Sequence, residues 1–146
     1  MIKESSRLRE YIRRIQRRLG LVDENGKSCC GITLSQCHSL VEIGRAGAIS
    51  LVDLATEMGL DKSTLSRTVE NLVQKGYAIR ETDARNRRYV VIKLTEEGNS
   101  LFKGIEKGMD DYFDKIYQLI PEGKRAQVLE SMQLMLEAVT KFECCQ

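Results

Sequence analysis

The chain has 146 residues, with 23 Lys and Arg against 21 Asp and Glu, which gives a net charge of +2. This length supports one domain with a hydrophobic core or two small interlocked lobes, and the near-neutral charge means that binding a polyanion requires local basic patches. No apolar run approaches the roughly 18 residues of a membrane span, and no signal peptide is recognisable. We therefore expect a cytoplasmic protein without a membrane partner.

Residues 4–19 are predicted to form an amphipathic helix. Its apolar stripe consists of Leu8, Tyr11, Ile12, Ile15 and Leu19, and its other face carries Arg7, Arg9, Arg13, Arg14, Arg17 and Arg18. We expect the arginine face to be solvated, with additional phosphate contacts as the alternative. The apolar stripe requires a partner outside this helix.

A polar linker over 21–31 precedes a helix that begins after Thr33, with Gln36 as the reciprocal member of a capping box. The inner face of that helix is expected to hold Leu34, Cys37, Leu40, Val41 and Gly44. Cys37 falls in the first turn, where the helix dipole favours a thiolate. Packing of Cys37 against Ile32 as a hydrophobic staple is the alternative.

Residues 50–76 contain two short helical segments separated by a Gly-Leu-Asp break. Ser50 is placed to cap the first segment, Gly59 to end it and Asp61 to cap the second. Their apolar stripes are Leu51, Leu54, Ala55 and Met58, and then Leu65, Val69, Leu72 and Val73. Two short helices joined by a tight turn indicate a helix-turn-helix, and a surface helical hairpin is the alternative.

The outer face of the second segment is rich in short hydrogen-bonding and cationic side chains, with Glu70 as its one carboxylate. A solvated helix more often carries Glu and Lys pairs four residues apart. Donors near a helix N-terminus are suited to base edges and phosphates. We therefore predict an outer face that also includes Thr68, with DNA contacts from Lys62, Ser63, Thr64, Ser66, Arg67 and Asn71.

A hairpin is predicted directly after this helix, with strands over 77–80 and 89–94 and a charged tip over 81–88. Arg85, Arg87 and Arg88 at the tip are suited to a minor groove or to flanking phosphates. Asp83 is expected to pair with one of these arginines. A solvated basic turn is the alternative, but the position after a helix-turn-helix favours DNA contact.

Residues 51–98 resemble the winged helix-turn-helix of MarR-type transcriptional regulators. The resemblance rests on an LA helix, a recognition helix that ends in L…KG, a wing with Asp83-Ala84-Arg85 and further basic residues, and a closing LTEEG that ends at Gly98. It implies a mainly α fold with a small β-wing and a homodimer that binds short palindromic double-stranded DNA. Members of that family are commonly released from DNA by a small ligand, a metal or thiol oxidation.

Two further helices are predicted over 96–120 and 124–142, separated by Pro121. The last has a broad apolar face that contains Val128, Leu129, Met132, Met135, Leu136, Val139 and Phe142. Because this face is too wide to cover a small wing domain alone, we expect it to join the N-terminal helix in a dimer interface. The sequence thus predicts a winged helix-turn-helix DNA-binding domain over 31–98 and a helical dimerisation region over 1–30 and 99–146.

The cysteines are the clearest candidates for residues that sense an effector. The cysteines are Cys29, Cys30, Cys37, Cys144 and Cys145. In a reducing cytosol such thiols are metal ligands, redox sensors or packing residues, and a disulfide within an adjacent pair is strained. Three thiols from residues 29, 30 and 37 suit arsenite or a similar soft metalloid, and addition of His38 suits zinc. No obligatory cofactor is expected.

The predicted function is a dimeric DNA-binding regulator, expected to act as a repressor, that a soft ion or oxidation of these cysteines releases from DNA. The alternative within the same class senses a small apolar or phenolic ligand, and its cysteines are structural. A thiol oxidoreductase is the remote alternative, because the chain lacks a CxxC pair and has one histidine. We therefore do not expect an enzyme.

Overall fold

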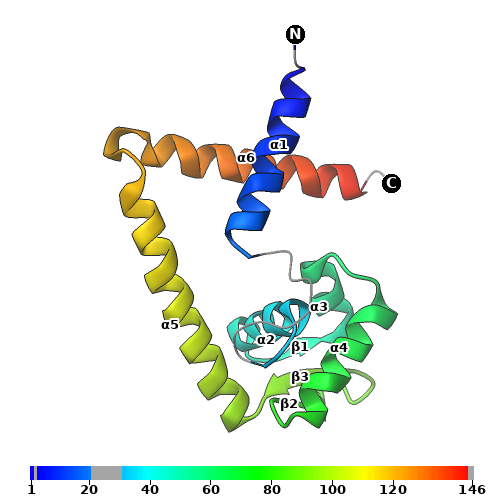
Figure 1. Ribbon diagram of the computed structural model, residues 1–146. Coiled ribbons are helices and arrows are strands. Elements are labelled where there is room, and N and C mark those ends of the chain that lie inside the picture. Colours follow the sequence, from blue (N-terminus) through cyan, green and yellow to red (C-terminus); the bar gives the residue numbers. More distant parts are fainter. Residues whose placement is uncertain (2, 21–30, 145–146) are drawn as a thin grey trace. The chain divides into compact units, whose positions relative to one another are not determined.

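The computed structural model describes residue 1, residues 3–20 and residues 31–144. In chain order the elements (Figure 1) are α1 (Glu4–Arg18), α2 (Leu34–Ala46), β1 (Ile49–Ser50), α3 (Leu51–Met58), α4 (Lys62–Gln74), β2 (Ala78–Thr82), β3 (Val90–Leu94), α5 (Glu96–Leu119), the short 3-10 helix η1 (Glu122–Lys124) and α6 (Arg125–Cys144). Contacts divide the chain into two compact units, residues 1–103 and 104–146, with the boundary inside α5. The mainly helical fold with one small antiparallel sheet confirms the predicted fold class.

A three-stranded antiparallel sheet in the order β1-β3-β2 packs with α2, α3 and α4 in the first unit (Figure 1). β3 is the central strand, with Ile92 opposite Ile49 of β1 and Arg80 of β2. β2 continues to Thr82, two residues beyond the predicted strand, and β3 begins at Val90, one residue after the predicted start, so the loop between them covers residues 83–89. The hairpin projects directly after α4, as predicted.

The core of this unit is formed by one face of each of three helices and by the sheet. Its fully buried apolar residues are Ile32, Leu40, Ile43, Leu54, Leu65, Val69, Leu72 and Ile92. Within α2 and α4 these residues recur every three or four positions, which is the spacing of one helix face. Burial of each such side chain contributes about 1.5–3 kcal/mol, so the core determines which face of α4 is left for solvent.

Local capping groups determine where the helices begin. Thr33 and Gln36 form the predicted capping box: Thr33 Oγ1 accepts from Gln36 N at 3.1 Å, and Gln36 Oε1 accepts from Thr33 N at 3.2 Å. Ser50 Oγ accepts from Asp53 N at 3.1 Å and starts α3. Gly59 ends α3 with a φ of 62°, a left-handed conformation that glycine adopts at no steric cost. The Ser50 cap and the turn at Gly59 confirm the predicted start and end of α3, and with them the predicted break between α3 and α4.

The inner face of α2 differs from the predicted one. Its buried residues are Gln36, Ser39, Leu40 and Ile43, whereas the half-buried flank contains Leu34, Cys37, Val41 and Gly44. Leu40 is buried as predicted, but the other predicted positions were wrong because the prediction followed apolar residues and two polar side chains occupy the buried stripe. The flank contacts α5 at Gly44, where a Cβ would come within 2.6 Å of the Phe102 ring.

The start of α5 packs closely against the turn that follows α4. Thr95 Oγ1 donates to Gly76 O at 2.6 Å, and Thr95 N donates to Tyr77 O at 3.0 Å. A Cβ on Gly98 would overlap the Tyr77 carbonyl oxygen, so this close approach requires glycine. The wing and the first turn of α5 are thereby attached to the end of α4.

In the second unit, a side chain from α6 caps the end of α5. Arg125 Nε donates to Tyr117 O at 3.2 Å and to Ile120 O at 3.1 Å, and its Nη2 donates to Gln118 O at 3.0 Å. These carbonyls lie where a helix end leaves acceptors without intrahelical partners. The predicted helix of residues 124–142 is confirmed, and none of its residues is buried. Across the described residues, no helix combines the length and apolarity needed to cross a membrane.

Candidate nucleic-acid interface

The carboxylate of Asp61 organises the N-terminus of α4. It accepts from Thr64 N at 3.2 and 3.3 Å, from the Thr64 hydroxyl at 2.7 Å and from the Ser63 hydroxyl at 3.2 Å. The hydrogen bond from the Thr64 side chain is the main cause that holds the pKa of Asp61 below its ordinary value. The predicted cap is confirmed, and it also engages two hydroxyls that the sequence placed on the DNA-facing surface.

The outer face of α4 presents the predicted DNA-contacting side chains to solvent. The exposed ones are Lys62, Ser63, Arg67 and Asn71, and the half-buried ones are Thr64 and Ser66. Thr68 was wrongly placed on this face, because it is 8% exposed and its hydroxyl donates to Thr64 O at 3.2 Å. Thr68 lies three residues after Leu65, which puts it on the buried stripe of the helix.

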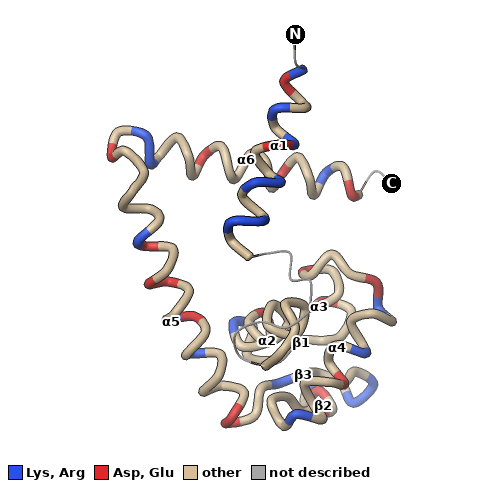
Figure 2. Tube along the Cα trace, viewed as in Figure 1, with Lys and Arg blue, Asp and Glu red and all other residues tan. Residues whose placement is uncertain are grey.

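The loop between β2 and β3 carries the three predicted wing arginines. Asp83 Oδ1 accepts from the backbone N of Arg85 at 3.0 Å, and Asn86 Oδ1 accepts from the backbone N of Arg88 at 3.1 Å. Asp83 therefore pairs with Arg85 as predicted, and it shapes the loop through the backbone amide of that residue. The side chains of Arg85, Arg87 and Arg88 are exposed, and Figure 2 shows the cationic residues gathered at this loop.

An ion pair that sequence reasoning missed joins α4 to the wing. Arg80 Nη1 on β2 lies 2.5 Å from Glu70 Oε2 on α4. The hydrogen bond from Arg80 is the main cause that lowers the pKa of Glu70 below its ordinary value. The sequence marked Glu70 as the lone carboxylate of the outer face, but a partner on a separate strand produces no periodic signal.

The described cysteines are not grouped with other metal ligands. Cys37 is half-buried in α2, Cys144 is exposed in α6, and His38 is exposed. Outside the described residues lie Cys29, Cys30 and Cys145. Within residues 3–20 and 31–144, no three His, Cys, Asp or Glu side chains lie close enough together to hold a metal ion. The sensing role of the cysteines stays a prediction.

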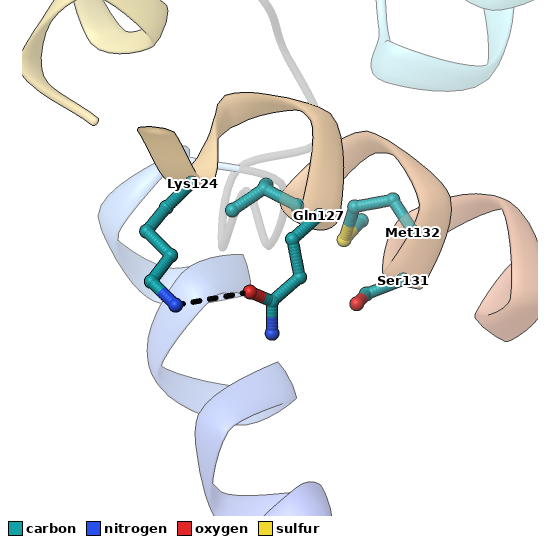
Figure 3. A pocket seen from close by; sticks show the side chains of 5 residues that line it. Lys124, Gln127, Ser131 and Met132 are labelled. Carbon is teal, nitrogen blue, oxygen red and sulfur yellow. Dashed lines mark hydrogen bonds between the residues drawn. The ribbon is translucent and has the colours of Figure 1, made fainter. Parts of the chain in front are cut away.

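A shallow hollow of about 280 Å³ lies on the side of α6 (Figure 3). It is lined by Lys124, Gln127, Val128, Ser131 and Met132. Two of the lining residues are hydrogen-bonded to each other, since Lys124 Nζ donates to Gln127 Oε1 at 3.4 Å. All of these residues come from α6 and the turn before it, whereas a small-molecule site usually encloses most of its ligand. The hollow alone therefore does not form a ligand pocket.

Comparison with known proteins agrees with this geometry. The sequence model of the MarR family matches residues 32–90, which include both helices of the helix-turn-helix and most of the wing. The uncharacterized HTH-type transcriptional regulator YfiV of Bacillus subtilis is 28% identical over 121 residues, which cover 82% of this chain and 75% of that protein. The HTH-type transcriptional regulator BilQ of Clostridium symbiosum is 25% identical over 103 residues, or 70% and 72% of the two chains.

Solved structures share the fold. Streptococcus pneumoniae FabT, crystallised in complex with DNA, matches with a TM-score of 0.83 at 20% identity, over 95% of this chain and 99% of FabT. A MarR transcriptional regulator from Methanosarcina mazei Go1 matches with a TM-score of 0.73 at 26% identity, over 91% and 99% of the two chains. The family match, the named relatives and the winged helix-turn-helix lead to one conclusion: residues 32–90 carry the sequence pattern of the MarR family, and the chain is similar to HTH-type transcriptional regulators over most of its length.

Proposed function

We propose that the protein is a homodimeric repressor that reads a palindromic operator with α4 and its wing. The observation that carries the proposal is the joint exposure of the α4 outer face and the arginine-bearing loop, which the Glu70–Arg80 pair connects. A two-fold dimer sets its two α4 helices in successive major grooves, about 34 Å apart. Each wing then reaches the flanking minor groove or backbone.

Within that arrangement, the side chains fall into two groups. Base edges and adjoining phosphates are contacted by Lys62, Ser63, Thr64, Ser66, Arg67 and Asn71. Flanking DNA is contacted by Arg85, Arg87 and Arg88. Because the net charge is only +2, these local cations supply the attraction for DNA.

Exposed apolar surface on both terminal helices supports the dimer. On α6, Leu129, Leu136 and Phe142 are 56%, 67% and 64% exposed. On α1 the exposed apolar residues are Leu8, Tyr11 and Ile15. Extended apolar surface on a soluble chain marks an association site. We infer that residues 1–30 and 99–146 of two copies associate, which leaves residues 31–98 of each copy available for DNA.

Fluorescence anisotropy with DNA from upstream of the protein's own gene tests the DNA surface. Arg67→Ala and Arg85→Ala are each expected to weaken binding roughly tenfold, and loss of a phosphate contact lowers the salt slope of log K by about one. Lys103→Ala removes an exposed cation from α5, outside the proposed surface, and is expected to change neither quantity. Wild-type affinity in Arg67→Ala would contradict the assignment of α4.

For the effector, we propose a soft metal or metalloid ion such as arsenite or zinc, or thiol oxidation, at Cys29, Cys30 and Cys37, with a second thiol pair at Cys144 and Cys145. Support comes from Cys37, which lies half-buried in the first turn of α2, where the helix dipole stabilises a thiolate. The alternative effector is a small apolar or phenolic molecule, with structural cysteines.

Cysteine substitution and thiol titration distinguish sensing by the cysteines from sensing of an apolar or phenolic molecule. Serine at residues 29, 30 and 37 is expected to abolish the release of DNA by arsenite, zinc or an organic peroxide in the same anisotropy assay. A triple variant that responds like the wild type would exclude cysteine sensing. Titration of reactive thiols with and without each additive then shows whether the additive occupies the cysteines.

A further inference from the structure

Lys75 ends the recognition helix and also reaches a different helix. Its backbone N donates to Asn71 O at 3.0 Å and closes the last turn of α4. Its ammonium Nζ donates to Gly31 O at 3.3 Å and to Gln36 Oε1 at 3.2 Å. These two acceptors lie 44 and 39 residues earlier in the chain, at the N-terminus of α2. One side chain thus connects the end of α4 to the start of α2.

The acceptor on α2 is held in place by its own surroundings. Gln36 is 6% exposed, and its Oε1 also accepts from Thr33 N at 3.2 Å in the capping box. An amide oxygen has two lone pairs, so both are used, one within α2 and one toward α4. The bond from the ammonium group is charge-assisted and therefore stronger than a bond between neutral groups.

We propose that Lys75 is a positioning residue for DNA recognition, which holds the C-terminal end of α4 on the N-terminal end of α2. The proposal rests on the proposed function, because the placement of α4 affects affinity only if α4 reads DNA. Asp61 organises the first turn of α4, and the Glu70–Arg80 pair attaches its middle to the wing. At the C-terminal end, where Thr95 is hydrogen-bonded to the turn after α4, Lys75 adds an attachment to α2. Through the Lys75 ammonium group, a displacement of the first turn of α2 would also displace the C-terminal end of α4.

A double-mutant cycle with DNA tests the proposal. Lys75→Met and Gln36→Leu are each expected to weaken operator binding roughly threefold to tenfold, which is less than the full effect of one charge-assisted hydrogen bond because the bond acts on DNA only through the placement of α4. The double variant is expected to bind no more weakly than Lys75→Met, because that change already removes the whole link, whereas Gln36→Leu leaves the bond from Lys75 to Gly31 O. Lys75→Arg keeps a cationic donor and is expected to restore part of the affinity. The salt slope of log K is expected to stay unchanged in all four variants.

Two control variants, Thr33→Val and Arg67→Ala, distinguish the positioning role from a general loss of stability and from failure of the proposed function. Thr33→Val removes the other half of the capping box but leaves the acceptor of Lys75, so it is expected to lower thermal stability and keep DNA affinity. A salt slope shallower by about 0.9 in Lys75→Met would assign Lys75 to a phosphate and overturn the positioning role. Wild-type affinity in Lys75→Met together with weakened binding in Arg67→Ala would overturn this inference alone. Wild-type affinity in Arg67→Ala would instead overturn the proposed role of α4 and, with it, this inference.

Discussion

The Arg80 guanidinium and the Glu70 carboxylate, 2.5 Å apart, connect the first strand of the wing to the middle of the recognition helix. The Arg80 and Glu70 side chains are 38% and 46% exposed, and ion pairs at such positions contribute little to stability. Their consequence is geometric: the pair links β2 of the wing directly to the outer face of α4.

Breaking this pair is expected to raise the pKa of Glu70. The folded pKa lies below the unfolded value of roughly 4.3, so the stabilisation is present above that pH and is lost as pH falls through the folded pKa. A carboxyl 13C NMR titration of Arg80→Met should therefore show Glu70 titrating at higher pH than in the wild type. Lys93→Met breaks the neighbouring Lys93–Glu81 pair, at 3.0 Å, and should leave the Glu70 titration unchanged. Identical Glu70 curves in the wild type and Arg80→Met would refute the pairing.

Gly98→Ala is expected to lower the free energy of unfolding by about 1–3 kcal/mol, because the added methyl group meets the Tyr77 carbonyl and the backbone must move. Gly104→Ala lies in the same helix, where a Cβ meets nothing within 4 Å. It should raise the free energy of unfolding by up to about 1 kcal/mol, as alanine favours a helix interior. Urea denaturation of both variants measures the two changes in the free energy of unfolding. An equal effect at the two positions would argue against the close approach of Gly98 to the Tyr77 carbonyl.

Ser39→Ala is expected to stabilise the fold by about 1 kcal/mol. Ser39 is fully buried in α2, and its hydroxyl makes no hydrogen bond with any described residue. Replacement of an unsatisfied polar group by an apolar one removes its desolvation cost. Ser35→Ala, one turn earlier and half-buried, should change the melting temperature little. A lower melting temperature for Ser39→Ala would show that the hydroxyl has a stabilising partner.

Leu136→Glu is expected to dissociate the proposed dimer, because it places a carboxylate in the exposed apolar face of α6. Light scattering coupled to size exclusion should then report a monomer, and operator affinity should fall by at least tenfold because two linked α4 helices no longer bind together. Lys141→Glu introduces the same carboxylate on the opposite side of α6 and should remain dimeric. A monomeric wild type would remove the basis of the two-fold arrangement.

The helix-turn-helix and the wing were predictable because their signals are local. Ser50, Gly59 and Asp61 mark helix ends within a few residues of the groups that they cap, and the apolar stripe of α4 follows one period. The inner face of α2 was not predictable, because Gln36 is buried against a lysine 39 residues later in the chain. The same holds for the link between Glu70 and Arg80. Composition and spacing therefore located the exposed outer face of α4 and the arginine-bearing loop, but not the long-range contacts that connect them to the rest of the fold.

The Asp61 cap also restricts what the first turn of α4 can recognise. An ionised carboxylate only accepts hydrogen bonds, so the Thr64 hydroxyl, 2.7 Å away, must direct its proton to Asp61. Toward a base edge this hydroxyl then offers lone pairs alone. It can accept from the exocyclic amine of adenine or cytosine, but it cannot donate to the N7 or O6 atoms of guanine. In the proposed DNA-reading role of α4, the residue that starts the helix thereby contributes to the base preference of a side chain three positions later.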